Sequence, residues 1–139
     1  MIKVVIFFSY FYFFLYSVLG YGFIFQNYVI KKKINQFYIG LLGAALVTTI
    51  SYFTIFYFYH GFAHNILIHT IGFGYFLYSC FKDENKKYIK NITLISFIFL
   101  SLILISKTHD DFAYYHLTFT KYLTENHIIF GMGHLNHGY

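Results

Sequence analysis

The stretch VVIFFSYFYFFLYSVLGYGFIF, residues 4–25, decides the fold, because its 22 residues include no charged side chain. At about 1.5 Å per residue, a helix of this length crosses a hydrocarbon core of about 30 Å. Lys3 precedes the run, as a lysine would in a secretory signal peptide. However, the run exceeds a usual signal-peptide apolar region of roughly 7–15 residues, and no small-x-small cleavage pattern follows it. We therefore expect a retained membrane helix.

The composition of the whole chain indicates the same solvent. Of its 139 residues, 58% are hydrophobic and 11% are charged, whereas soluble domains average about 25% charged residues. The formal net charge of +5 comes from lysine alone, since the chain contains no arginine. Arginine is the side chain best suited to bidentate phosphate and base contacts, so we do not expect nucleic-acid binding. Cys80 is the only cysteine, which excludes an intramolecular disulfide and any multi-cysteine metal site.

Three further apolar segments predict an all-α, polytopic membrane protein with about four transmembrane helices in a single membrane region, residues 1–139. The expected helices cover about residues 4–25, 37–59, 62–81 and 88–106. In the second of them, small residues recur every four positions and would form a face that allows close helix contact. These residues are Gly40, Ala44 and Thr48.

The placement of the lysines predicts the orientation. Residues 26–36 and 82–91 fall on the same side of a four-helix path, and together they hold seven of the ten lysines. The positive-inside rule therefore puts these loops in the cytoplasm and both termini outside it. All eight histidines then lie at the outer face: His60, His64 and His69 at or near the outer turn, and the other five in the tail.

The tail, residues 107–139, is predicted to form an outer amphipathic helix followed by a loop. Residues 108–111 have the [ST]-x-x-[DE] form of a capping box, and apolar residues then recur at near-helical spacing. The expected helix covers about residues 111–125 and lies along the membrane interface. Asp110 and Asp111 either cap this helix, or one of them points into a surface pocket as a metal ligand or general base.

Two histidine pairs are weaker candidates for a site. His134 and His137 are three residues apart in a glycine-rich loop, where zinc or copper could be held by mixed histidine and aspartate ligands. His60 and His64 are four residues apart, and such a pair is more typical of an interfacial polar contact than of a metal site. No spacing rule supports a defined metal site in the chain.

The run Asp111-Phe112-Ala113-Tyr114-Tyr115-His116-Leu117, with Asn136-His137-Gly138 after it, resembles part of an uncharacterised family of bacterial multi-pass inner-membrane proteins. That family is similar in layout to GT-C-type glycosyltransferases, which use an acidic residue in an outer loop against a lipid-linked sugar donor. The resemblance implies that Asp111, with Asp110 beside it, is catalytic, and that a divalent metal is the cofactor. It also implies substrate-binding neighbours at Tyr115, His116, His137 and Gly138.

Two functions follow. The first is the N-terminal piece of a longer GT-C-like glycosyltransferase that uses polyprenyl-phosphate-linked sugar in envelope glycan assembly; such a piece would be inactive alone. The alternative is a small membrane binding or assembly protein that packs with other membrane helices and binds metal at a histidine-rich outer face. A proton-coupled transporter is not indicated, because the four expected spans contain no carboxylate.

Overall fold

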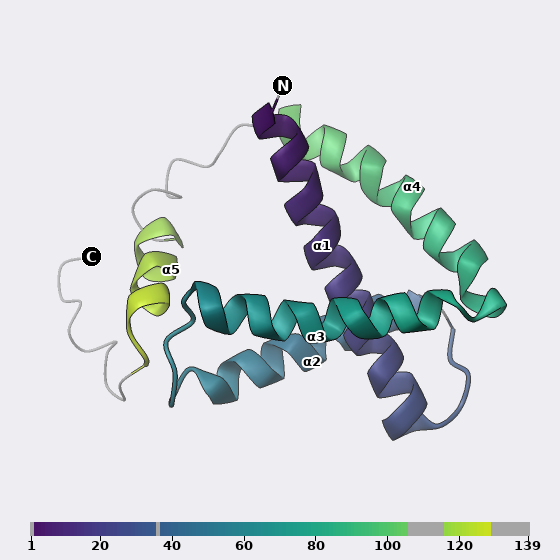
Figure 1. Ribbon diagram of the computed structural model, residues 1–139, viewed down its shortest axis with the longest axis horizontal. Coiled ribbons are helices and arrows are strands. Elements are labelled where there is room, and N and C mark those ends of the chain that lie inside the picture. The colour runs from purple at the N-terminus through teal and green to yellow at the C-terminus, as the bar shows by residue number, and fades with distance from the viewer. Residues whose placement is uncertain (1, 36, 106–115, 129–139) are drawn as a thin grey trace.

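The computed structural model describes residues 2–35, 37–105 and 116–128, and every regular element in these residues is a helix (Figure 1). The elements are α1 (Ile2–Ile24), a short π-helix η1 (Phe25–Ile30), α2 (Phe37–Thr54), α3 (Phe62–Cys80), α4 (Asp83–Ile105) and α5 (His116–Glu125). The predicted all-α fold is confirmed for these residues.

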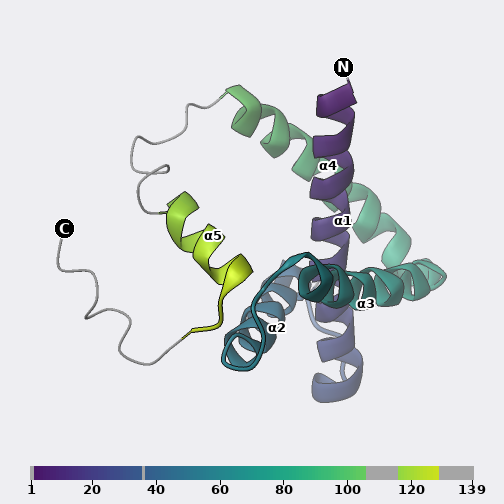
Figure 2. The same cartoon turned by 60° about the vertical axis from the view of Figure 1, so that its left-hand side comes forward.

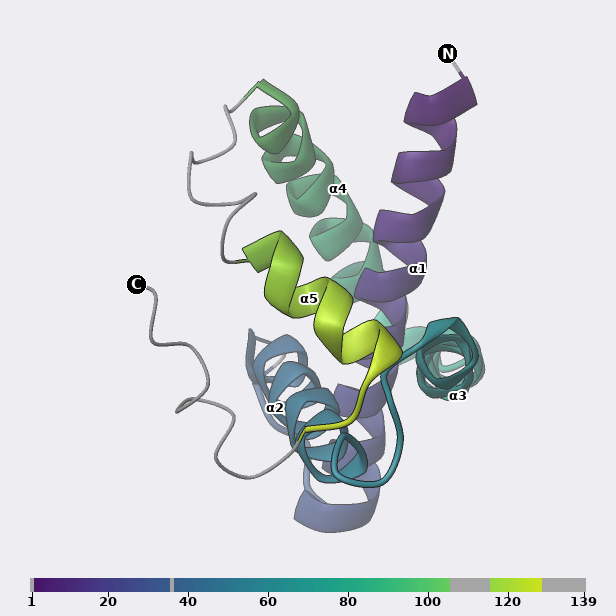
Figure 3. The same cartoon turned by 90° about the vertical axis from the view of Figure 1, so that its left-hand side faces the viewer.

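Helix α1 is the central element of the fold. In Figure 3, α2 and α3 lie on opposite sides of the C-terminal half of α1. Every α1 residue from position 17 to position 23 is buried there. Figures 1 and 2 show that α3 runs across α1 and not alongside it, while α4 returns from the end of α3 toward the start of α1. The helices therefore cross one another and do not form a parallel bundle.

Glycines make these crossings close. A Cβ atom on Gly20 of α1 would overlap the backbone carbonyl of Gly72 in α3. On the other side of α1, a Cβ atom on Gly43 of α2 would overlap the carbonyl of Val18. Because only glycine has no Cβ atom, the two helix backbones can meet directly at each of these points.

The face of α2 that makes this contact differs from the predicted one. Ala44 and Thr48 are exposed, whereas Ile39 and Gly43 are buried against α1. Gly40 lies only at the edge of the contact, where its Cβ would meet the Leu19 side chain at 3.7 Å. The prediction that Ala44 and Thr48 form the close-packing face is wrong, because α2 turns the neighbouring stripe toward α1.

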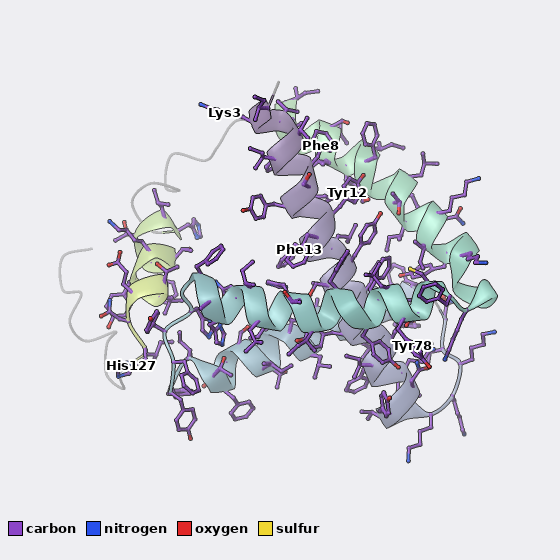
Figure 4. All side chains as sticks on the ribbon, viewed as in Figure 1. Lys3, Phe8, Tyr12, Phe13, Tyr78 and His127 are labelled. Carbon is purple, nitrogen blue, oxygen red and sulfur yellow. The ribbon has the colours of Figure 1, made fainter. Side chains whose placement is uncertain are left out.

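The apolar core joins the four long helices. Its buried members are Leu19 and Phe23 of α1, Ile39 of α2, Phe76 of α3 and Tyr88 of α4. Nearer the N-terminus of α1, Phe8 and Tyr12 lie toward α4 (Figure 4). The Phe8 ring centroid lies 5.9 Å from that of Phe97, and the Tyr12 hydroxyl donates a hydrogen bond of 3.4 Å to the carbonyl of Thr93.

Two helix boundaries differ from the predicted ones. Helix α2 ends at Thr54, five residues before the expected position 59, because the chain turns there. In that turn the amides of Tyr57 and Phe58 both donate to the carbonyl of Thr54. Helix α4 begins at Asp83, five residues before the expected position 88, so the charged segment predicted as a loop forms its first turns. Acidic residues are favourable at a helix N-terminus, and the sequence places two of them there.

The prediction of four membrane-spanning helices is confirmed only in part. Among the described residues, two helical segments are long and apolar enough to cross a membrane by length and composition, Ile2–Ile30 and Phe37–Thr54. Helix α3 has sufficient length, but polar residues such as His64, Asn65 and His69 lower its hydropathy. The apolar part of α4, Tyr88–Leu102, is shorter.

Candidate functional site

A threonine and two histidines meet where α2 ends and α3 begins. The Oγ1 atom of Thr54 lies 3.1 Å from Nε2 of His60 and 3.0 Å from Nε2 of His64. The two imidazole rings are stacked, with centroids 4.3 Å apart and planes inclined by 9°. We call this group, with Asn65, the histidine cluster.

The hydrogen bonds of the histidine cluster are all satisfied by one arrangement of protons. Asn65 Nδ2 donates to the carbonyl of His60 at 2.8 Å, which directs its Oδ1 toward Nδ1 of His64 at 3.3 Å. Since a carboxamide oxygen only accepts, His64 carries its proton on Nδ1, and its Nε2 is an acceptor. The single Thr54 hydroxyl proton is shared between this Nε2 and the carbonyl of Ser51, which lies 3.2 Å from Oγ1. His60 Nε2–H then donates to the Thr54 oxygen. The result is a closed relay from His60 through Thr54 and His64 to Asn65.

The end of α5 and the residues that follow it are bound to the same turn. The His60 backbone amide donates a 2.8 Å hydrogen bond to the carbonyl of Leu123. The amide of Ile128 donates to the carbonyl of Ile55 at 3.2 Å. His127, an exposed residue of this segment, lies at this end of the molecule (Figure 4). The histidine cluster therefore lies where α2, α3 and the end of α5 are held together.

Burial favours the neutral form of His60. Desolvation lowers the pKa of His60 below its ordinary value of 6.5, and the nearby His64 lowers it further. The carbonyl of Ser51 opposes these effects by stabilising the protonated ring. The direction of the shift agrees with the relay, in which His60 is a neutral Nε2–H donor.

The geometry suits a hydrogen-bond relay better than a metal centre. A zinc ion needs ring nitrogens at about 2.0–2.1 Å whose lone pairs converge on it. Here the two Nε2 atoms face the hydroxyl oxygen of Thr54 at 3.1 and 3.0 Å, so a zinc ion would require both rings to move and would displace the hydroxyl. Among residues 2–35, 37–105 and 116–128, no group of three or more histidine, cysteine, aspartate or glutamate side chains could hold a metal ion.

A second feature adjoins the cluster on the side facing α1. A cavity of about 290 Å³ lies between α1 and α3, with four aromatic rings, Asn65, Ile66 and His69 in its wall. The rings are those of Tyr10, Phe13, Phe14 and Phe62. Nδ1 of His69 lies 3.1 Å from Oγ of Ser17, a fully buried residue of α1. The cavity is thus an aromatic space with its polar residues held by partners within the fold.

Comparisons of the chain with protein-family models, with curated proteins and with solved structures find no match. The site must therefore be interpreted from its own residues.

Most of the site residues that the sequence predicts lie outside the described part of the chain. These are Asp110, Asp111, Tyr115, His137 and Gly138, together with His134 of the second histidine pair. His116 is described: it is the first residue of α5, its side chain is exposed, and its carbonyl accepts a hydrogen bond of 2.7 Å from Thr120 Oγ1. The predicted helix of residues 111–125 is observed over His116–Glu125.

Sequence reasoning found the His60 and His64 pair but missed Thr54 and the attached segment after α5. Thr54 lies six residues before His60, and it is the one aliphatic hydroxyl between positions 52 and 59, which was the available signal. No pattern in the sequence connects Leu123 or Ile128 with the turn, because these contacts are made by backbone groups.

Proposed function

We propose that this chain is an integral protein of the bacterial inner membrane that packs with other membrane helices and carries the histidine cluster at its outer face. The observation that carries the proposal is the outward surface of the long helices. It exposes large apolar side chains on α1, α2, α3 and α4, among them Val5, Leu41, Leu67 and Phe99, each more than 60% exposed. Soluble monomers rarely expose contiguous apolar patches larger than a few hundred Å². Lipid chains and neighbouring helices are the surroundings that remove such a surface from water.

The residues at the ends of α2 and α3 support an orientation of the chain in the membrane. Both helices connect a lysine-rich segment at one end with the histidine cluster at the other. Their 18 and 19 residues correspond to about 27–29 Å of helix, close to the thickness of a hydrocarbon core. We propose that α1, α2, α3 and the apolar part of α4 all cross or enter the bilayer. The lysine-rich segments are then cytoplasmic, and both termini are extracytoplasmic.

Single-cysteine labelling tests this proposal. In a Cys80→Ser background, Lys32→Cys and His127→Cys place one thiol at each end of α2 and α3. A membrane-impermeant maleimide added to intact cells should label His127→Cys, and it should label Lys32→Cys only after lysis. The opposite pattern would invert the orientation. Release of the protein from membranes by alkaline carbonate would overturn the membrane assignment itself.

A second candidate function is carried by the residue pattern of positions 111–117 and 136–138. Under this second candidate function, the chain is the N-terminal piece of a GT-C-like glycosyltransferase, and Asp111 acts on a polyprenyl-phosphate-linked sugar. Asp111→Asn should be made in the longest reading frame that contains this chain, and glycolipid production measured in cells. We expect production to be lost in Asp111→Asn and retained in Glu125→Gln, a carboxylate outside the pattern. Unchanged production in Asp111→Asn would remove this candidate.

A further inference from the structure

The formal charge of the chain is concentrated at one end. Residues 26–36 contain three lysines and no acid, and residues 81–91 contain four lysines and two acids. Together these segments account for the whole formal net charge of +5. The remaining three lysines are matched by three carboxylates elsewhere in the chain.

The fold brings the two segments together. Ile34, directly after the first three lysines, packs against the core cluster that contains Tyr88 of α4. Asn27 in η1 donates a 2.9 Å hydrogen bond to the hydroxyl of Tyr75 near the end of α3. Lys31 ends η1 in the left-handed conformation, at φ 56°, with its amide bonded to the carbonyl of Gln26. The two segments, 50 residues apart in sequence, therefore form one surface, which we call the lysine end.

The side chains of the lysine end suit a lipid headgroup region. Its described lysines are all exposed: Lys31, Lys32, Lys33, Lys82, Lys86 and Lys90. Large aromatic side chains are exposed beside them, with Phe81 86% and Tyr28 66% exposed. The Lys82 ammonium lies 5.7 Å from the centroid of the Tyr78 ring, which lies at the end of α3 opposite His127 (Figure 4). Lysines interleaved with exposed aromatics are typical of the membrane–water interface.

We propose that the lysine end binds the headgroups of anionic phospholipids and so selects them over zwitterionic ones. This inference rests on the membrane location proposed above, but it adds a ligand class that orientation alone does not require. Clusters of four to eight lysines next to a membrane helix attract anionic lipid. Even two such lysines at the surface are expected to give a preference of about 30-fold.

The chain contains no tryptophan, so Phe81→Trp creates a single tryptophan at the lysine end, whose fluorescence can be excited separately from that of the tyrosines. The purified protein is reconstituted in equal mixtures of phosphatidylglycerol and phosphatidylcholine, with bromine on the acyl chains of one lipid or the other. We expect much stronger quenching when phosphatidylglycerol carries the bromine, and near-equal quenching in 1 M salt. Replacing Lys31, Lys32 and Lys82 by glutamine lowers the formal net charge of the two segments from +5 to +2 and should reduce the preference by at least tenfold. The matched control replaces Lys3, Lys107 and Lys121, and it should keep the preference.

The outcomes separate the two proposals. Equal quenching by the two brominated lipids at low salt would overturn the selection of anionic lipid while leaving the membrane location intact. A preference that is undiminished by the loss of Lys31, Lys32 and Lys82, with helicity unchanged by circular dichroism, would also overturn it. Absence of quenching by either lipid would overturn the membrane location. Tyr78→Trp, one turn earlier in α3, is a second reporter should Phe81→Trp not fold.

Discussion

His60 and His64 lie with their imidazole rings stacked, centroids 4.3 Å apart, and both rings contact the single hydroxyl of Thr54. Two imidazolium cations so close together would repel each other, and protonation of His64 would remove the Nε2 acceptor that the relay requires. The stacked arrangement therefore depends on neutral rings. The His60 amide also donates to the carbonyl of Leu123 in the last turn of α5, so the same residue belongs to the relay and to the attachment of α5.

The first prediction concerns pH. Burial and His64 lower the pKa of His60 in the folded protein below its ordinary value of 6.5. The folded state then binds fewer protons than the unfolded state, so this contribution to stability is complete above pH 6.5 and is lost as the pH falls below that value. We expect a lower unfolding temperature at pH 5 than at pH 7.5 for the protein in detergent. His60→Gln should reduce this difference, and His116→Gln, a change at an exposed histidine of α5, should not.

The second prediction concerns the hydroxyl at the centre of the relay. Thr54→Val keeps the shape of the side chain but leaves Nε2 of His60 and of His64 without their shared partner. The loss is expected to cost about 1–3 kcal/mol of unfolding free energy. Thr49→Val in the same helix is the matched control, because the Thr49 hydroxyl is exposed and bonds only the carbonyl of Ala45. Thermal unfolding of the two variants side by side tests the difference, and equal stabilities would contradict the relay.

The sequence predicted the class of the fold and the order of its helices, because apolar runs and charged breaks identify helices in a chain with few charges. It did not predict how the helices pack. Periodicity identified a small stripe at Gly40, Ala44 and Thr48, but the neighbouring Gly43 makes the close contact. The buried stripe contains a single small residue beside Ile39, so a repeat of small residues could not identify it, and the choice of face depends on the partner helix.

The candidate site was only partly predictable for a similar reason. The four-residue spacing of His60 and His64 was visible, but their common contact required α2 to end at Thr54 and reverse direction. The helix was expected to continue to position 59, because the aromatic run through this turn has the same hydropathy as the helix before it. The resemblance-based residues from Asp110 to Tyr115, and His137 with Gly138, lie outside the described residues, so their roles stay predictions.

The third prediction tests the crossing of α1 and α3. A Cβ atom on Gly72 would lie 2.5 Å from both the carbonyl oxygen and Oγ of Ser17, whereas one on Gly74 would meet no atom within 4 Å. Gly72→Ala should therefore cost about 1–3 kcal/mol through overpacking. Gly74→Ala should stabilise the helix by about 0.5–1 kcal/mol, because alanine loses less backbone entropy than glycine. Equal effects of the two substitutions on the unfolding temperature would show that α1 and α3 do not cross at Gly72.

The last prediction concerns the buried contact between Ser17 and His69. The Ser17 side chain is fully buried, and Nδ1 of His69 is its hydrogen-bond partner at 3.1 Å. If Nδ1–H donated to Ser17, the buried serine proton would lack an acceptor, so the hydroxyl donates and His69 carries its proton on Nε2. Ser17→Ala should then cost about 1 kcal/mol and release the ring, which changes the ¹⁵N shifts of His69 toward a mixture of tautomers. Ser9→Ala, at an exposed serine of α1 that bonds the carbonyl of Val5, should leave both the stability and those shifts unchanged; unaltered His69 shifts in Ser17→Ala would refute the assignment.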